Sequence, residues 1–146
     1  SMGAASTILA LGMDQGFSFA VSDCAFSDLG SFLRYQGRVS YHLPGLFSWG
    51  ASWLNCMMHG FRFDSVRPVD ALKENQVPIL FIHGAEDDLI PPAMCQQLHE
   101  AAYGPGKTHM LMMPNAGHAR SYYVGAPAYK ARVKKFLEDL VDMNDL

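Results

Sequence analysis

Residues 77–84 read VPILFIHG, an apolar run that ends in a histidine and a glycine. A short continuous run of branched and aromatic side chains is typical of a strand covered on both faces, as strands of parallel sheets are. Pro78 lacks a backbone donor and is tolerated only near the start of such a strand. The run therefore predicts a buried strand over residues 77–82, followed by a loop at the carboxyl edge of a parallel sheet.

Two further apolar runs, residues 17–22 and 108–113, have the texture of short strands. Between and around them, helical periodicity predicts helices over residues 2–13, 26–35, 91–103 and 126–141. Strands that alternate with helices in this way form a parallel sheet with crossover connections. We therefore expect a single α/β domain over residues 1–146.

Residues 38–65 interrupt this alternation with a segment rich in large apolar side chains and poor in charges. We interpret the segment as a cap-like insertion with one helix around residues 50–59. Its aromatic and methionine side chains can line an acyl-binding pocket, although such stretches more often form core. We expect core together with a partial pocket.

The composition narrows the possible partners. With 146 residues, of which 49% are hydrophobic, the chain can build one globular core. Its formal net charge of −3 is spread without long runs of one sign, which gives no basis for a nucleic-acid partner. Its apolar stretches are shorter than the roughly 18 residues of a membrane span. We expect neither a nucleic-acid partner nor a membrane span.

The cysteines and histidines show no local pattern of metal ligands. Three widely spaced cysteines suggest neither a disulfide framework nor a zinc site, and we interpret them as buried free thiols. No metal-ligand spacing connects a cysteine or carboxylate cluster with His42, His59, His83, His99 or His109. His83, at the end of the central strand, is expected only to pack. We therefore expect no cofactor and no metal.

Two loops at the expected carboxyl edge carry polar side chains. Residues 83–91 read HGAEDDLIP after one strand, and residues 114–118 read PNAGH after the next. In open parallel sheets the reactive groups lie on such loops. An acid after one strand and a histidine after the next predict an acid and histidine pair at this edge.

The order of a serine, an acid and a histidine along the chain resembles that of the α/β hydrolases. Residues 1–3, SMG, are similar to the second half of the G-x-S-x-G nucleophile elbow. The acid and histidine loops, with DCAF at residues 23–26, extend the resemblance over essentially the whole chain, closest to bacterial acyl-ester hydrolases and peptidase-like proteins. It implies Ser1 as nucleophile, Asp87 as orienting acid and His118 as general base.

These roles also make chemical sense. A serine hydroxyl is a weak nucleophile and needs an imidazole to take its proton, and the imidazole needs a carboxylate to fix its tautomer. Glu86 and Asp88 are rivals for the acid, but only Asp87 keeps the family's spacing to Pro91. The backbone N–H of Met2 would face the developing oxyanion. The substrate would be an ester, a thioester or a peptide.

The sequence departs from the family pattern at its start. The glycine two residues before the serine, the strand leading to it and the loop that supplies a second oxyanion donor are absent. The chain thus resembles the C-terminal half of an α/β hydrolase. A Ser-Met start also matches the remnant of a cleaved tag, in which case Met2 would be the first native residue.

Two other functions stay open. The chain can be a non-catalytic half-domain that self-associates, or binds an N-terminal complement, through an exposed sheet edge. Ser1 can also act as an N-terminal nucleophile with its own amine as base, although the buried strands and the order of Asp87 and His118 favour the elbow.

Overall fold

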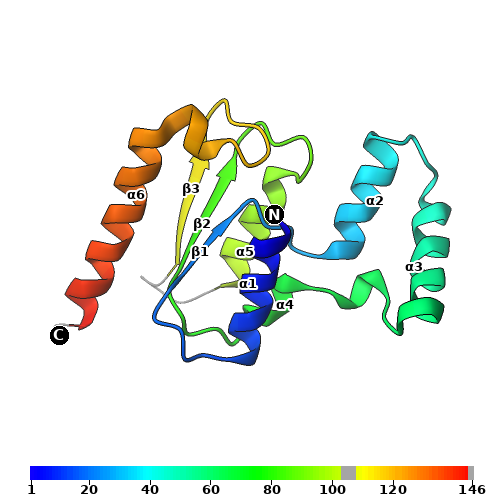
Figure 1. The fold of residues 1–146 in the computed structure, drawn as a ribbon, viewed down its shortest axis with the longest axis horizontal. Coiled ribbons are helices and arrows are strands. Elements are labelled where there is room, and N and C mark those ends of the chain that lie inside the picture. Colours follow the sequence, from blue (N-terminus) through cyan, green and yellow to red (C-terminus); the bar gives the residue numbers. More distant parts are fainter. Residues whose placement is uncertain (103–107, 145–146) are drawn as a thin grey trace.

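A computed structural model describes residues 1–102 and 108–144, and these residues surround one parallel sheet (Figure 1). The sheet has the order β1-β2-β3, formed by β1 (Ala20–Asp23), β2 (Ile79–Gly84) and β3 (Thr108–Met113). Asp23 is in register with Ile82, and Gly84 with Met113, so the strands end near one edge. The parallel α/β fold expected from the sequence is confirmed.

Helices cover both faces of the sheet (Figure 1). In chain order the helical segments are α1 (Met2–Met13), α2 (Leu29–Val39), α3 (Gly45–His59), the 3-10 segment η1 (Phe63–Ser65), α4 (Pro68–Ala71), α5 (Pro92–Ala101) and α6 (Ser121–Asn144). The end expected for the helix after Pro91, near residue 103, lies outside the described residues. No helix of the described ranges is both long and apolar enough to cross a membrane.

The central strand β2 carries the core because all of its residues are buried. Side chains alternate between the faces of a strand, so Ile79 and Phe81 pack with α1 and α5, while Leu80 and Ile82 pack against Phe136 of α6. The apolar run of residues 77–82 therefore has partners on both sides. This burial is what the sequence predicted for a strand of a parallel sheet.

Several element boundaries differ from those expected. β1 begins at Ala20 rather than residue 17, and Phe19 instead packs edge-on against Phe136. α2 begins at Leu29 because the Asp28 carboxylate accepts a hydrogen bond from the Ser31 N–H and caps the helix. At the other end of the chain, α6 begins at Ser121 and bends at Gly125, whose backbone is not helical.

The segment around α3 is not core, and that part of our expectation is wrong. α3 is longer than predicted, and α2 and α3 stand to one side of the sheet (Figure 1). α3 packs against α2 and η1, which leaves most of its large side chains without cover. Exposed side chains of this segment are Tyr41, Leu43, Leu46, Phe47, Trp49, Trp53, Leu54, Met57, Met58 and Phe61.

A groove of about 370 Å³ lies between α2 and α3, and that it binds an acyl group stays a prediction. Its wall includes Leu33, Phe47 and Gln36. The Gln36 side chain is almost fully buried, donates a hydrogen bond to the Leu89 carbonyl at 2.5 Å and accepts one from the Ser40 hydroxyl at 2.6 Å. Gln36 thus connects α2 with the loop that follows β2.

The loops after β2 and β3 pack against each other at Gly84. A Cβ atom on this glycine would lie 2.2 Å from the Ala116 carbonyl oxygen and 2.6 Å from that of Gly117. Both distances are far inside van der Waals contact, and the obstructing atoms are backbone. Only a residue without a side chain therefore allows the two loops to approach this closely.

Gly84→Ala should lower the free energy of unfolding by about 1–3 kcal/mol, because the added methyl group must displace backbone. Gly50→Ala is the control, because a Cβ atom there meets nothing within 4 Å. Within a helix this second change should stabilise the protein by about 0.5–1 kcal/mol. Urea unfolding followed by far-UV circular dichroism measures both values, and a Gly84 variant as stable as the wild type would contradict the analysis.

Candidate active site

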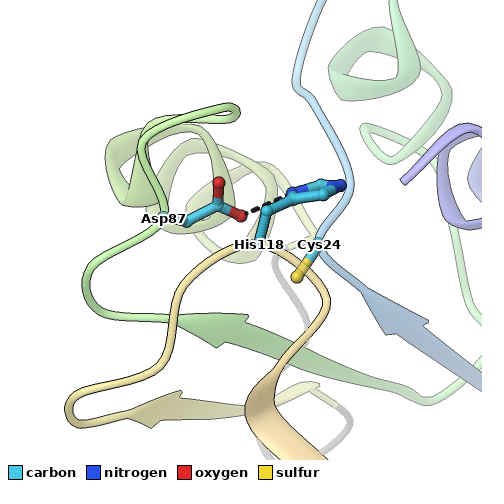
Figure 2. A group of neighbouring side chains, drawn as sticks. All are labelled: Cys24, Asp87 and His118. Carbon is cyan, nitrogen blue, oxygen red and sulfur yellow. Dashed lines mark hydrogen bonds and ion pairs between the residues drawn. The ribbon is translucent and has the colours of Figure 1, made fainter.

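Three loops that follow the three strands meet at the carboxyl edge of the sheet. Asp23 ends β1 and Cys24 follows it; the acid loop (residues 85–91) follows β2; the histidine loop (residues 114–120) follows β3. Figure 2 shows the side chains of Cys24, Asp87 and His118, one from each loop, gathered at this edge.

The Asp87 carboxylate is the most heavily hydrogen-bonded group of the acid loop. Its Oδ1 atom accepts the backbone N–H groups of Leu89 at 3.0 Å and Ile90 at 2.8 Å. An aspartate that binds backbone two and three residues ahead closes a tight turn. Asp87 is buried, whereas its neighbours Glu86 and Asp88 are exposed. The fold therefore separates Asp87 from its two rivals.

His118 meets Asp87 through its Nδ1 atom, which lies 2.8 Å from Asp87 Oδ2 (Figure 2). Asp87 is ionised near neutral pH and can only accept, so Nδ1 carries the proton and the Nε2 atom of a neutral ring has a free lone pair. No hydrogen bond joins Nε2 to any residue within the described ranges. The His118 side chain is about one-fifth exposed, so Nε2 can meet a substrate or a nucleophile.

The hydrogen bonds to Asp87 keep it ionised. Burial opposes its charge, but the ion-pair contact with His83 and hydrogen bonds from the Ile90 N–H and His118 outweigh this effect and lower the pKa of Asp87 to about 2. A permanent negative charge therefore faces the His118 ring, where it would stabilise an imidazolium.

Cys24 joins the loops after β1 and β3. Its Sγ atom accepts the Ala119 N–H at 3.3 Å, and its S–H group donates to Asp23 at 3.1 Å. Burial and the Asp23 carboxylate raise the pKa of Cys24 to about 12, so the thiol is protonated and a poor nucleophile.

Cys24 and Cys95 are buried as expected, whereas Cys56 is only half-buried. Asp23 also accepts a hydrogen bond from the Tyr129 hydroxyl at 3.2 Å, which ties this edge to α6.

The backbone of the site contains three left-handed residues that are not glycine. Cys24, Asn115 and Ala119 have φ values of 57°, 57° and 56°. Asparagine tolerates this region, but cysteine and alanine seldom adopt it. Two of these residues flank His118 in the histidine loop, so local backbone strain accompanies the placement of the imidazole.

His83 does more than pack, contrary to our expectation from the sequence. Its ring is fully buried, and its Nε2 atom lies 2.9 Å from the Ile90 carbonyl oxygen and 3.2 Å from Asp87 Oδ2. Burial disfavours its charged form, but contacts with Asp87, Cys95 and the Ile90 carbonyl raise the pKa of His83 to about 10. The four-residue separation of His83 and Asp87 in the sequence is the one signal that could have indicated this contact. The contact forms only because the acid loop turns and places the carboxylate beside the ring.

Ser1 immediately precedes α1, and its carbonyl accepts the first helical hydrogen bond from the Ala5 N–H at 3.0 Å. Ala5 packs with Phe26, Ile90 and Met94, so the first turn of α1 lies beside the loops after β1 and β2 (Figure 1). The Ser1 side chain is exposed and has no hydrogen bond to any described residue. Asp87 and His118 are thus in contact, while Ser1 and Met2 lie at the same edge of the sheet without bonding to them.

The ligand atoms of Cys24, Asp87 and His118 lie within 4.8 Å of one another, a spread that a metal ion could bridge. Each of these groups already has a hydrogen-bond partner, and Asp87 Oδ2 is shared by two imidazoles. These hydrogen bonds account for the cluster, and we assign no metal to it.

Beside His118 lies a polar depression of about 610 Å³ whose wall includes Glu86, Asp88 and Arg120.

Comparison with known sequences gives a relative in Bacillus subtilis strain 168, the uncharacterized protein YqkD. It is 31% identical to this chain over 151 residues, and the alignment covers 99% of the chain and 48% of the relative. The chain therefore spans about half the length of the curated relative that it matches.

Solved structures also match nearly the whole of this chain with only part of their own length. The esterase of Pyrococcus furiosus superposes with a TM-score of 0.67 and 21% identity, covering 94% of this chain and 51% of the esterase. The acylaminoacyl peptidase of Pyrococcus horikoshii superposes with a TM-score of 0.66 and 18% identity, covering 93% of this chain and 22% of the peptidase.

At these identities the likeness concerns the fold, and it confirms the α/β-hydrolase architecture expected from the sequence. The model of the prolyl oligopeptidase family matches residues 1–144, nearly the whole length, and the chain belongs to that family.

Proposed function

We propose that this chain carries the catalytic residues of a serine hydrolase that cleaves ester or peptide bonds through an acyl-enzyme intermediate. The observation that carries the proposal is the contact between His118 Nδ1 and the buried, ionised Asp87, which leaves Nε2 free at the carboxyl edge of the sheet. An imidazole held in this tautomer is what a general base for a hydroxyl nucleophile requires.

In this proposal the Ser1 hydroxyl attacks the substrate carbonyl carbon while His118 Nε2 takes its proton. The negative charge that develops on the carbonyl oxygen faces the backbone N–H of Met2, at the start of α1, where the first amides of a helix have no partner within the helix. His118 then gives its proton to the leaving alcohol or amine. Water, activated by the same imidazole, releases the acid and restores Ser1.

Asp87 has two roles in this scheme. Its negative charge stabilises the imidazolium that forms when His118 takes the proton, and its fixed orientation selects the tautomer with Nδ1 protonated. Because Oδ1 is held by the Leu89 and Ile90 N–H groups, the carboxylate has little freedom to turn away. The acid therefore needs no rearrangement during the reaction.

The class of substrate follows from the family and the fold. Membership of the prolyl oligopeptidase family favours a carbonyl substrate, and the similar structures include an esterase and an acylaminoacyl peptidase. Esters and peptides react through the same tetrahedral intermediate and differ in the leaving group, which His118 must protonate. Thioesters fit the same chemistry.

A non-catalytic half-domain is the second candidate, and the position of β1 favours it. In the described part of the chain, β1 pairs with β2 alone, so its other edge is unpaired. Such an edge can accept a strand from another copy or from an N-terminal complement. The two candidates differ in whether Ser1 is chemically reactive.

His118→Ala should lower ester hydrolysis by several orders of magnitude, because the members of a triad act as a unit. Asp87→Asn should approach that loss, on the order of 10⁴ in kcat, because it favours the wrong imidazole tautomer. Asp88→Asn is the matched control and should have little effect, because Asp88 is exposed. Initial rates with an activated ester measure all three, with thermal unfolding as a check of folding. Equal rates in the wild type and in the His118 and Asp87 variants would contradict the proposal.

A fluorophosphonate probe should label the protein stoichiometrically at Ser1, because the Ser1 oxygen displaces fluoride from phosphorus while His118 takes the hydroxyl proton. Mass spectrometry of the labelled peptide locates the adduct, and Ser1→Ala should abolish it. A folded protein that does not react would support the half-domain, particularly if sedimentation shows self-association.

A further inference from the structure

The catalytic roles proposed above involve one histidine, but Asp87 contacts two. His118 Nδ1 lies 2.8 Å from Asp87 Oδ2, and His83 Nε2 lies 3.2 Å from the same oxygen. The side chains of Asp87 and His83 are both fully buried, so water does not compete for this contact. The acid therefore contacts one partly exposed and one buried imidazole.

The position of the proton on His83 follows from its other neighbour. Its Nε2 atom lies 2.9 Å from the Ile90 carbonyl oxygen, which can only accept a hydrogen bond. Nε2 must therefore carry a proton, whether the ring is neutral or charged. The Nδ1 atom of His83 is buried without a hydrogen-bond partner in the described residues. This N–H of Nε2 donates to the Ile90 carbonyl, and Asp87 Oδ2 lies 3.2 Å from the same nitrogen as an ion-pair contact.

Ile90 links the two side chains through its own hydrogen bonds. Its carbonyl accepts from His83, and its N–H donates to Asp87 Oδ1. One backbone unit therefore holds both the carboxylate and the ring that contacts it. His83 Nε2 and Asp87 Oδ2 cannot separate unless this turn of the acid loop opens.

We propose that His83 is a positioning residue whose Nε2–H group, shared between the Ile90 carbonyl and Asp87 Oδ2, limits how strongly Asp87 attracts the proton of His118. This inference rests on the proposed role of His118 as general base. A carboxylate beside an imidazole favours the protonated ring, and a ring that is already protonated cannot accept the proton of a nucleophile. A second N–H beside the same oxygen weakens that attraction and leaves His118 better able to accept the proton of a nucleophile.

The other groups near these rings do not weaken the attraction of Asp87 for the proton of His118. The Cys24 thiol is protonated and therefore uncharged. Glu86, Asp88 and Arg120 line the depression beside His118, but Glu86 and Asp88 are exposed, where water and salt weaken their effect. Cys95 faces His83 rather than His118. The contact with His83 is, in contrast, among the main influences that lower the pKa of Asp87.

Two substitutions of similar shape test the proposal. The amide nitrogen of glutamine can occupy the place of the histidine Nε2 atom, so His83→Gln keeps a donor, whereas His83→Met fills similar space without one. His99→Met is the control, because His99 packs against the ring of Phe81 in the core and does not contact the site. Thermal unfolding establishes that each variant is folded.

Two measurements by NMR report on His118 without turnover. The first is the chemical shift of the low-field proton between His118 Nδ1 and Asp87 Oδ2. The second is the pH midpoint at which the ring carbon resonance of His118 changes on protonation. His83→Met should move this midpoint to higher pH by about one unit and shift the proton resonance downfield, as expected when a competing donor is removed. His83→Gln should stay near the wild type, and His99→Met should show no change.

Ester hydrolysis adds a third measurement. The acid limb of the kcat/KM profile should move to higher pH in His83→Met by the same amount as the NMR midpoint, because a more basic His118 loses its proton later. An unchanged NMR midpoint in folded His83→Met would overturn the inference. A shifted midpoint in a protein with no hydrolytic activity would keep the role of His83 and refute the proposed function instead. If His83→Met does not fold, His83→Asn replaces it, because its shorter amide lies nearer the Nδ1 position and removes the donor at Nε2.

Discussion

The buried negative charge of Asp87 is the constraint on which the site depends. A carboxylate without hydrogen bonds in a protein interior costs several kcal/mol, so the surrounding chain must supply donors. The acid loop supplies two backbone N–H groups, the end of β2 supplies His83, and the histidine loop supplies His118. The turn before α5, the buried ring of His83 and the partly exposed ring of His118 can thus be understood as responses to one charge.

The fold could be predicted from the sequence because its central strand has a clear signature. An uninterrupted apolar run between turn residues fits β2 and few other elements, and the acid and histidine loops follow from where β2 and β3 end. Asp87 was favoured over its neighbours because its spacing to Pro91 matches the hydrolase motif that the sequence resembles. The apolar run and the spacing to Pro91 are both local patterns, so they can be recognised in a single sequence.

The remaining features depend on contacts between distant segments. The hydrogen bond between Cys24 and Ala119 joins residues 95 positions apart, and the sequence of neither loop predicts it. The contact of His83 with Asp87 depends on how the acid loop turns, which residue types alone do not specify. The exposure of α3 could not be predicted for another reason. An apolar composition indicates that a helix face favours burial, but it does not say which segment packs against that face.

Both tryptophans of the chain, Trp49 and Trp53, lie on α3, one helical turn apart, and more than half of each side chain is exposed. Intrinsic tryptophan emission from this protein therefore originates on α3, which stands to one side of the sheet (Figure 1). A spectral change on adding a ligand would indicate an altered environment of α3. Melting of the sheet, in contrast, would be nearly invisible to this signal unless α3 moved with it. The protein thus contains a built-in fluorescent reporter for the segment around α3, most of whose large side chains are exposed.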